Sequence, residues 1–412
     1  MNNKNQHIPV GYKSSPLGII PEDWEVKRLG EVCDVDNDSL SNKTDPNYEF
    51  DYISLSDVDS DCIEITTTRQ IFRTAPSRAR RIVKRGDVII STVRPNLQAF
   101  SLIKNEVKDL IVSTGFAVLT PKQIKSEYLY QYVFSQPVSK QFYQLVVGSN
   151  YPAVNSSDVS HLKIAVPPLP EQHRIVSVLS LWDTAISKQT ALIEKLTIRK
   201  KGLMQQLLTG KKRLKGFEEE WKRIPIKDFA KEVSIRNSNC KDYIVLSCTK
   251  YDGLVPSLEY FGKQIYSDDL SNYKIISKGH FAYATNHIEE GSIGYQSKYE
   301  YGLISPMYTV FITDRKRIDD IFLFAVFKSH HLIHLYKSMM EGSINRRGGL
   351  RWDSFSTIKI YLPPLAEQNA IASVLVETDK EIEIQKQKLM RLQEQKKGLM
   401  QVLLTGKKRI II

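Results

Sequence analysis

Two stretches of the chain, residues 167–213 and 363–409, place apolar side chains at alternating steps of four and three. This 3.5-residue period is typical of a helix that packs along one seam against another helix. Polar residues interrupt both seams at matched places, and such positions fix the register of a coiled coil at a cost in stability. The predicted seam consists of Ile175, Leu179, Trp182, Ile186, Gln189, Ile193, Leu196, Lys200, Leu203 and Leu207, and of Ile371, Leu375, Thr378, Ile382, Gln385, Leu389, Leu392, Lys396, Leu399 and Leu403.

Each stretch also carries the start and stop signals of one long helix. Two prolines precede Glu171 in the first copy and Glu367 in the second, where the positive end of a helix favours a carboxylate. Gly210 and Gly406 suit a left-handed cap, and the Lys-Lys-Arg behind each glycine complements the negative helix end. These signals predict two helices of about 40 residues, or about 60 Å each. The alternative is that each helix packs only on its own domain.

The two stretches are copies of one another. Aligned at an offset of 196 residues, they share 26 identities in 47 positions without a gap. This period is far longer than the roughly 20 to 50 residues of solenoid repeats, so the chain consists of two halves in tandem. Gly202 and Gly398, at matched positions inside the helices, indicate either a close approach to the backbone or a tolerated kink.

About 150 residues precede each helix, with little identity between the halves but a similar plan. Both regions begin near a tryptophan and carry short strand-like runs such as 87–93 and 281–285. Each then contains a late helical candidate, 127–144 or 319–340, and ends in an apolar strand, 162–166 or 358–362. A shared frame with divergent loops suggests two related modules aimed at two targets. The predicted boundaries are 1–15 for an N-terminal tail, 16–166 and 214–362 for two α/β domains, and 167–213 and 363–412 for the helices.

The composition, 42% hydrophobic and 25% charged over 412 residues, predicts two to four folded units and excludes disorder. The net charge of +12 favours a polyanionic partner. No apolar run reaches the roughly 18 residues that a membrane span needs, and residues 1–15 lack the apolar core of a signal peptide, so a cytoplasmic protein is expected. The four cysteines form no C-x-x-C pair, so we expect neither a disulfide framework nor a metal site.

Basic residues gather in the divergent loops of both halves. Arginine pairs bidentately with guanine and asparagine with adenine, while other polar side chains commonly hold phosphates. For any single arginine, a solvated surface charge is the alternative. Taken jointly, the clusters predict DNA contacts at Arg69, Arg73, Arg78, Arg80, Arg81 and Arg94 in the first half, and at Asn286, His287, Arg346, Arg347 and Arg351 in the second.

The sequence lacks the motifs of three classes of enzyme that act on DNA: nucleotide-driven motors, amino-methyltransferases and nucleases. The two T-G-K-K runs lack the upstream glycine of a phosphate-binding loop, and no Asn- or Asp-Pro-Pro-aromatic tetrad of an amino-methyltransferase is present. A nuclease centre would have to combine Asp87 with Glu106 and Lys108, yet glycine rather than proline precedes Asp87. His330, His331 and His334 have no accompanying glutamate motif or cysteine and are expected on a helix surface. The sequence predicts no catalytic residues.

Several motifs together resemble the specificity subunits of type I restriction-modification systems. They are the PPLPEQ and PPLAEQ helix starts, the KKGLMQ-x-LLTGKKR helix ends, GDVIISTVRPN (86–96), GSNYPAVN (148–155), KGHFAYATNH (278–287) and GLISPMYTVF (302–311). The resemblance covers nearly the whole chain. It adds Asn150 and Tyr151, within GSNYPAVN, to the expected DNA contacts.

This resemblance implies an α+β fold with two α/β target-recognition domains in tandem, each followed by a long helix, the two helices pairing as an antiparallel coiled coil. It implies a bipartite double-stranded DNA target and assembly with two methyltransferase and up to two restriction subunits, with no membrane association. The subunit itself is expected to catalyse nothing and to bind no cofactor; S-adenosylmethionine, ATP and Mg²⁺ are expected on the partner subunits. The alternatives are a recognition region related to a fused methylase-nuclease and a helical scaffold without DNA binding.

Overall fold

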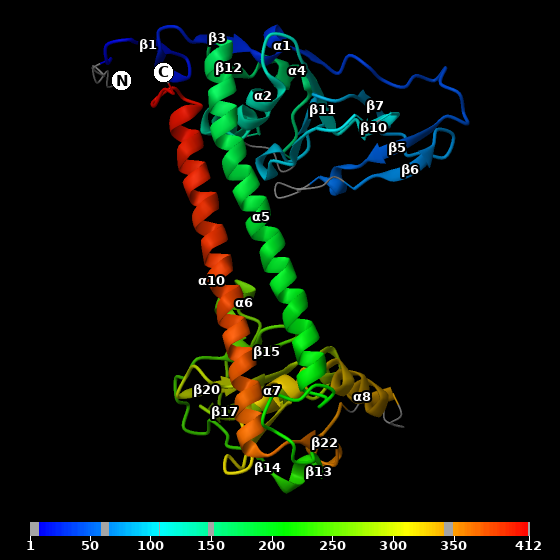
Figure 1. Ribbon diagram of the computed structural model, residues 1–412, viewed down its shortest axis with the longest axis vertical. Coiled ribbons are helices and arrows are strands. Elements are labelled where there is room, and N and C mark those ends of the chain that lie inside the picture. The colour runs from blue at the N-terminus through cyan, green and yellow to red at the C-terminus, as the bar shows by residue number, and fades with distance from the viewer. Residues whose placement is uncertain (1–7, 59–65, 107, 147–151, 342–348, 411–412) are drawn as a thin grey trace. The chain divides into compact units, whose positions relative to one another are not determined.

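The computed structural model describes residues 8–58, 66–106, 108–146, 152–341 and 349–410 (Figure 1). The chain divides into two compact units, residues 1–191 with 386–412, and residues 192–385. The boundary falls inside both long helices, α5 (Leu169–Leu207) and α10 (Leu365–Leu403), each of 39 residues. Each unit therefore contains one mixed domain, the beginning of the helix that follows it and the end of the other helix. The predicted pair of long helices is confirmed.

The domain of the first unit is built on two four-stranded sheets (Figure 1). One has the order β6-β5-β10-β7, with β5 and β10 parallel, and the other has the antiparallel order β4-β11-β8-β9. Two further strand pairs are β1-β2 and β3-β12. The strands are β1 (Tyr12–Ser15), β2 (Gly18–Pro21), β3 (Glu25–Arg28), β4 (Cys33–Val35), β5 (Glu49–Ile53), β6 (Thr68–Ile71), β7 (Ala79–Val83), β8 (Val88–Ser91), β9 (Phe100–Leu102), β10 (Leu110–Ser113), β11 (Phe116–Pro121) and β12 (Lys163–Val166). The helices are α1 (Leu29–Val32), η1 (Leu55–Asp57), η2 (Pro95–Leu97), α2 (Ser126–Val133), α3 (Gln136–Val146) and α4 (Ser156–His161).

The domain of the second unit repeats one of these sheets and replaces the other. Its four-stranded antiparallel sheet β14-β21-β18-β19 corresponds to β4-β11-β8-β9, and its pair β13-β22 corresponds to β3-β12. Two antiparallel strand pairs, β15-β16 and β17-β20, complete it. The strands are β13 (Lys222–Pro225), β14 (Ala230–Val233), β15 (Leu246–Thr249), β16 (Gly253–Pro256), β17 (Lys274–Ser277), β18 (Phe281–Ala284), β19 (Ile293–Tyr295), β20 (Tyr301–Ile304), β21 (Tyr308–Thr313) and β22 (Lys359–Leu362). The helices are η3 (Ile226–Asp228), α6 (Ser257–Phe261), η4 (Ile288–Glu290), α7 (Asp320–Phe327), α8 (His330–Glu341) and α9 (Trp352–Phe355).

The helical candidate late in each domain is divided into two helices, so the prediction of one helix was wrong in both halves. The breaks lie at equivalent places, between α2 and α3 and between α7 and α8. A serine directly precedes the second helix in each case, Ser135 before α3 and Ser329 before α8. Its carbonyl accepts the first helical hydrogen bond, from Ser139 N–H and from Ile333 N–H respectively. The turn lets both short helices contribute buried side chains to the domain core.

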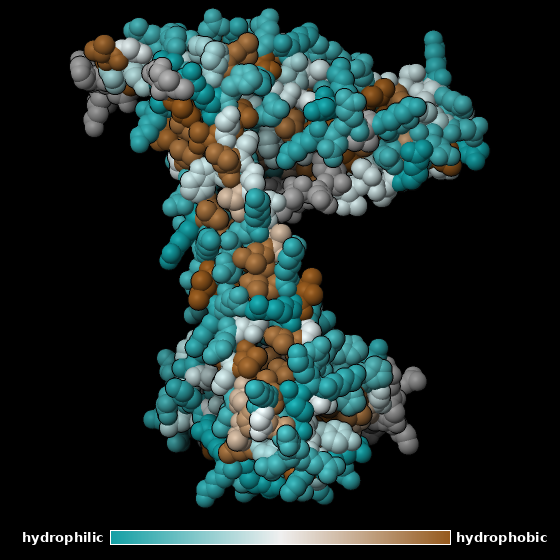
Figure 2. Space-filling view, in the orientation of Figure 1, coloured by the Kyte–Doolittle hydropathy of each residue, from teal (hydrophilic) through white to brown (hydrophobic). Residues whose placement is uncertain are grey.

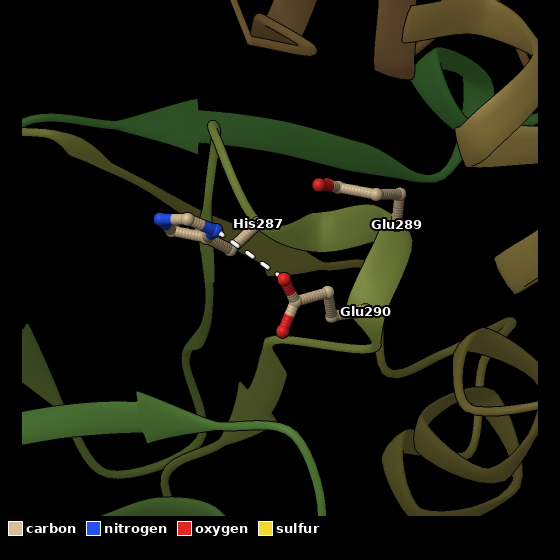
Figure 3. Close-up of side chains that lie close together, drawn as sticks. All are labelled: His287, Glu289 and Glu290. Atoms are coloured by element: carbon tan, nitrogen blue, oxygen red, sulfur yellow. Dashed lines mark ion pairs between the residues drawn. The ribbon is translucent and has the colours of Figure 1, made fainter.

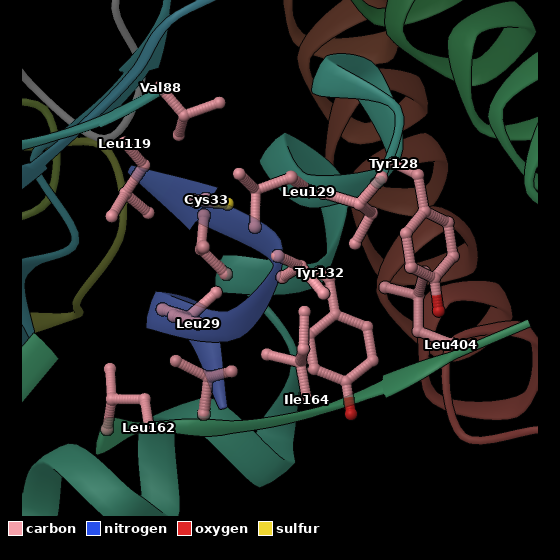
Figure 4. Packing of buried hydrophobic residues seen from close by; sticks show 14 of the residues in the cluster. Leu29, Cys33, Val88, Leu119, Tyr128, Leu129, Tyr132, Leu162, Ile164 and Leu404 are labelled. Atoms are coloured by element: carbon pink, nitrogen blue, oxygen red, sulfur yellow. The ribbon is translucent and has the colours of Figure 1, made fainter. Parts of the chain in front are cut away.

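The core of each domain includes residues from the far end of the other domain's helix. In the first unit, Trp24 and the apolar face of α2 share a core with Leu403 and Leu404, at the end of α10. Figure 4 shows Leu404 beside Tyr128 of α2. In the second unit, Leu207 and Leu208, which end α5, belong to the core around Phe311 and Phe322. Each domain therefore depends on both helices for its core, rather than only on the helix that follows it.

Ion pairs within each unit show that α5 and α10 run antiparallel. In the first unit Lys396 Nζ lies 2.6 Å from a carboxylate oxygen of Asp183. In the second, Lys200 pairs with Asp379 and Arg199 with Glu381. Higher numbers on one helix meet lower numbers on the other, as antiparallel packing requires. The two lysines that interrupt the predicted seam thus neutralise carboxylates at matched positions of the opposite helix.

Every predicted seam position is buried or half-buried, including Gln189 and Thr378, which are each 6% exposed. Figure 2 shows apolar side chains interrupting the hydrophilic surface along the long helices. The large exposed apolar residues of these helices all lie off the seam and are Leu169, Leu181, Leu192, Ile198, Ile384 and Met390. A Cβ added at Gly202 or Gly398 would meet nothing within 4 Å, so the chain itself makes no close approach at these glycines.

Candidate nucleic-acid interface

A polar cleft of about 430 Å³ opens at one end of the four-stranded sheet of the second domain. Asn286, in the loop after β18, lines the cleft, and so does Arg351, the residue directly before α9. The two segments are joined by a hydrogen bond from Leu350 N–H to the carbonyl of Thr285, 2.9 Å long. The structure therefore brings together two of the predicted DNA contacts that are 65 positions apart in sequence.

Close packing of the backbone holds this arrangement. A Cβ at Gly349 would lie 2.1 Å from the carbonyl oxygen of Thr285, so only glycine fits there. On the other side, Thr285 Oγ1 donates to the carbonyl of Met307 at 3.0 Å. The cleft is completed by Glu232, Lys274, Thr285, Pro306, Met307, Tyr308, Thr309, Gly349, Trp352 and Asp353.

The charged groups in the cleft are of both signs. Lys274 Nζ donates to the carbonyl of Tyr308 at 2.6 Å, and burial lowers the pKa of this ammonium. Among the residues that the structure describes, neither the guanidinium of Arg351 nor the carboxylate of Asp353 has a hydrogen-bond or ion-pair partner, and the Asn286 amide nitrogen donates no bond. A concave site with free hydrogen-bond donors and acceptors beside the indole ring of Trp352 is suited to recognising the polar edges of bases rather than a bare phosphate.

His287, the neighbouring predicted contact, is exposed and lies beside two carboxylates. Its Nδ1 is 3.7 Å from a carboxylate oxygen of Glu290, as the dashed line in Figure 3 marks. Potential metal-binding atoms of His287, Glu289 and Glu290 lie within 4.8 Å of one another. His287 and Glu290 are both exposed, and exposed acidic groups commonly gather without a metal.

The loop that carries Asn286 and His287 is fastened by a residue that the sequence reasoning missed. Lys328, which caps α7, donates from Nζ to the carbonyls of Thr249, Lys250 and Gly291 at 3.2, 2.9 and 2.6 Å. Burial lowers the pKa of this ammonium. Lys328 thereby ties the β15–β16 turn to the loop after β18. Nothing in the sequence distinguishes Lys328 from other lysines, because its partners are backbone carbonyls.

In the first domain, much of the predicted arginine cluster is engaged by neighbours. Arg69 on β6 lies 3.2 Å from Glu49 and 3.7 Å from Asp51 across the strand pair. Arg80 stacks 4.7 Å above the Phe72 ring.

Arg81 pairs with Asp36 and donates to Ser156 Oγ at 3.2 Å, and burial lowers the pKa of its guanidinium. Arg73, Arg78 and Arg94 are exposed. Arg94 also occupies the left-handed region, with φ 50°, and its N–H donates to the carbonyl of Pro152 at 2.7 Å. The remaining predicted contacts, Asn150, Tyr151, Arg346 and Arg347, lie outside the described residues.

Asp87 and the three histidines of α8 are the residues that were considered from the sequence as catalytic or metal-binding groups, and the structure shows their contacts and exposure. Asp87 accepts hydrogen bonds from Lys84 N–H and from Thr120 Oγ1, and burial raises the pKa of its carboxyl. Such bonds hold the turn that precedes β8. The three histidines of α8 are exposed on the helix surface, as predicted. Across the described ranges, no helix is long and apolar enough to span a membrane.

The two mixed domains share an antiparallel sheet, and each is built on the ends of the two antiparallel helices. Sequence comparison gives the family: the chain matches the type I restriction modification DNA specificity domain twice, over residues 21–197 and 218–394, and it belongs to this family. The match spans both domains and most of both helices. The chain thus has two copies of a DNA sequence-recognition module.

Individual relatives agree in length and fold. The chain is 26% identical to the putative type I restriction enzyme MjaX specificity subunit of Methanocaldococcus jannaschii, with 97% of each chain covered. It is also 26% identical to the MjaVIII specificity subunit of the same organism, over 95% of this chain and 94% of that one.

Among solved structures, a chain from a study of assembly and conformational transition in the type I R-M system superposes with a TM-score of 0.63. It has 21% identity and covers 94% of this chain and 99% of its own. A type I S subunit from M. genitalium gives a TM-score of 0.53 at 13% identity, over 92% of this chain and 96% of that one. At these identities the structural likeness establishes the fold.

Proposed function

We propose that this chain is the non-catalytic specificity subunit of a type I restriction-modification complex and reads a bipartite site in double-stranded DNA, one half-site per domain. The observation that carries the proposal is the tandem duplication itself. The two domains share the antiparallel sheet β4-β11-β8-β9 or β14-β21-β18-β19, but the side chains around it differ. A common frame with different surfaces is suited to two different base sequences.

In this proposal the second domain reads bases through the cleft that holds Asn286 and Arg351, while the lysines and arginines around both domains contact phosphates. The helix pair sets the length of the spacer between the half-sites. Two methyltransferase subunits and up to two restriction subunits dock on the chain. They bring S-adenosylmethionine, ATP and Mg²⁺, and the methyltransferase extrudes one adenine per half-site into its own pocket.

The test is a domain exchange within the complex. Residues 16–166 are replaced with the matching domain of a relative, and methylated adenines are mapped across the genome for the parent and the hybrid. We expect one half of the target to change while the other half and the spacer stay the same. A hybrid that alters both halves, or neither, contradicts the division of labour. A parent that binds DNA without salt dependence or supports no methylation contradicts the function itself.

A further inference from the structure

A buried carboxylate at the start of each long helix is held by an arginine from the end of the other helix. In the second unit Arg213, six residues beyond the end of α5, donates from Nε and Nη2 to the two oxygens of Glu367 at 2.5 and 2.7 Å. Trp221 Nε1 donates to the same carboxylate at 3.1 Å. The Glu367 side chain is 0% exposed. The hydrogen bond with Glu367 raises the pKa of Arg213.

The first unit repeats the arrangement with the equivalent residues. Arg409, beyond the end of α10, donates from Nε and Nη2 to Glu171 at 3.1 and 2.6 Å, and Trp24 Nε1 donates to Glu171 at 2.9 Å. Arg409 also forms two bonds with Asp23, of 2.8 and 2.7 Å. The bonds to Glu171 and Asp23 raise its pKa. We call each arginine–glutamate–tryptophan set a clasp: Arg213–Glu367–Trp221 and Arg409–Glu171–Trp24.

The clasps are crossed with respect to helix and domain, because each arginine follows the helix of one domain and binds at the entrance of the other. Arg213 follows the helix of the first domain but binds at the entrance of the second, and Arg409 follows the helix of the second but binds at the entrance of the first. The helix-ending glycines reinforce the crossing. Gly210 and Gly406 have φ of +67° and +70°, and each lies against the tryptophan of the clasp that its own arginine completes.

Each clasp meets its domain where the chain enters it. Trp24 directly precedes β3 and Trp221 directly precedes β13, the strands that pair with β12 and β22 just before the long helices begin. A bidentate arginine–carboxylate pair has directional geometry, so it fixes orientation as well as contact. We call the strand pairs β3-β12 and β13-β22 the roots of the two domains. The clasp therefore fixes how each root packs against the ends of the two helices.

We propose that Arg409 and Arg213 are positioning residues for DNA reading, each serving the domain across the chain: Arg409 the first half-site and Arg213 the second. This rests on the proposed function. Without the arginine, a buried glutamate keeps its charge with only the indole N–H as partner, which favours rearrangement or protonation at the domain root. The surface of that domain then meets DNA in a less defined orientation, whereas the other domain retains its clasp.

The experiment uses the full chain in complex with its methyltransferase subunit. The variants Arg409→Met and Arg213→Met keep the aliphatic bulk and remove the guanidinium. Methylation rates are measured on duplexes that match the parent's target or carry a substitution in one half-site only. We expect Arg409→Met to lower discrimination at the first half-site by at least about tenfold, and Arg213→Met to do so at the second, with the other half-site kept within about twofold.

Two controls separate positioning from loss of folding. Arg409→Lys and Arg213→Lys retain the charge but not the bidentate bond, and should recover part of the discrimination. A core truncation in the same domain, Leu119→Ala for the first and Leu323→Ala for the second, serves as a comparison matched in thermal unfolding temperature. If the matched core variant relaxes the half-site as much as the arginine variant, the clasp has no positioning role.

Other outcomes also overturn the inference. Arg213→Met acting on the first half-site, either variant acting equally on both half-sites, or unchanged discrimination with both would each contradict crossed positioning. Failure of the proposed function is recognised separately, because the parent complex would then show no preference for either half-site.

Discussion

The two domains differ most where they face solvent and agree most where they meet the long helices. The first domain adds a four-stranded sheet, β6-β5-β10-β7, where the second has the pairs β15-β16 and β17-β20. Yet both keep the strand pair at the domain root, the buried glutamate and the tryptophan that bonds to it. Selection for different targets leaves the reading surfaces free to diverge, whereas the crossed helix ends must fit both roots.

The repeated identities have a physical explanation in this comparison. Asp183 and Asp379 pair with the lysines of the opposite helix, and Gln172 and Gln368 accept from the backbone N–H groups of Lys125 and Asp319. These positions are the same in both copies because each performs the same task at the two ends of the helix pair.

The strongest test of the equivalence is to remove one half. A chain ending at Leu214 keeps one domain and one helix. The end of that helix carries Leu207, Leu208 and Arg213, the equivalents of the Leu403, Leu404 and Arg409 that α10 and the residues after it supply to this domain in the full chain. Two copies should pair about a two-fold axis and direct methylation to a palindromic site made of the first half-site and its inverse. The assembly should be weaker than the parent because pairing now depends on concentration.

In this fragment, changing Leu196 and Leu203 to Asp should abolish pairing, because it buries unpaired charge in the seam. Light scattering measures assembly, and methylation mapping with the modification subunit measures function. A fragment that stays monomeric at tens of micromolar and never supports methylation would show that the helix ends are not interchangeable.

A smaller effect is expected from trimming the crossed core contacts. Leu404 is 0% exposed in the core of the first domain, and its equivalent Leu208 is 8% exposed in that of the second. Leu404→Ala should lower stability by about 2–5 kcal/mol, and Leu208→Ala by an amount near the lower end. Hydrogen exchange read by mass spectrometry should show faster exchange in the first domain for Leu404→Ala and in the second for Leu208→Ala. The reverse pattern would mean that each helix end stabilises the domain that precedes it.

Changes in the cleft should sharpen the difference between the reading surfaces. Asn286→Ala or Arg351→Ala should cost about 1–3 kcal/mol of binding if the side chain reads a base, and should relax one position in the second half-site only. A phosphate contact would instead weaken all sequences alike and lower the salt slope by about one. Binding curves at several salt concentrations distinguish the two, with Lys263→Ala as a charge-removal control away from the cleft. Unchanged affinity for both variants would place the cleft outside the interface.

The smallest effect concerns the matched glycines of the helices. Gly202→Ala and Gly398→Ala add a methyl group that meets nothing within 4 Å and remove a flexible residue from a helix. Each should raise stability by about 0.5–1 kcal/mol, which thermal unfolding can detect. If stability rises but methylation falls for either variant, a partner subunit approaches the backbone at that glycine. A fall in stability would contradict the open surroundings found here.

The long helices and the strands before them could be predicted because they depend on short-range sequence patterns. The 3.5-residue period, the Pro-Pro starts and the Gly-Lys-Lys-Arg ends predict helices that agree with α5 and α10 in position and length. The strands 162–166 and 358–362 were also predicted within a residue of β12 and β22. The apparent arginine cluster of the first domain was harder to judge. Its neutralising partners, Glu49, Asp51 and Asp36, come from strands or loops distant in sequence, which local patterns do not reveal.

The sequence by itself determined the duplication, the helix pair and the residues at its ends, since propensity, capping and periodicity act within a few turns. In the structure the two ends of α5, a helix of 39 residues, lie about 60 Å apart, so Glu171 and Arg213 of the same helix cannot pair. Only the tertiary structure decided that Arg409 reaches Glu171 and Arg213 reaches Glu367. The arginine and the glutamate each occur twice in the chain, and the residues around the two copies are alike. The local sequence therefore does not decide which arginine binds which glutamate; the antiparallel packing of α5 and α10 decides it.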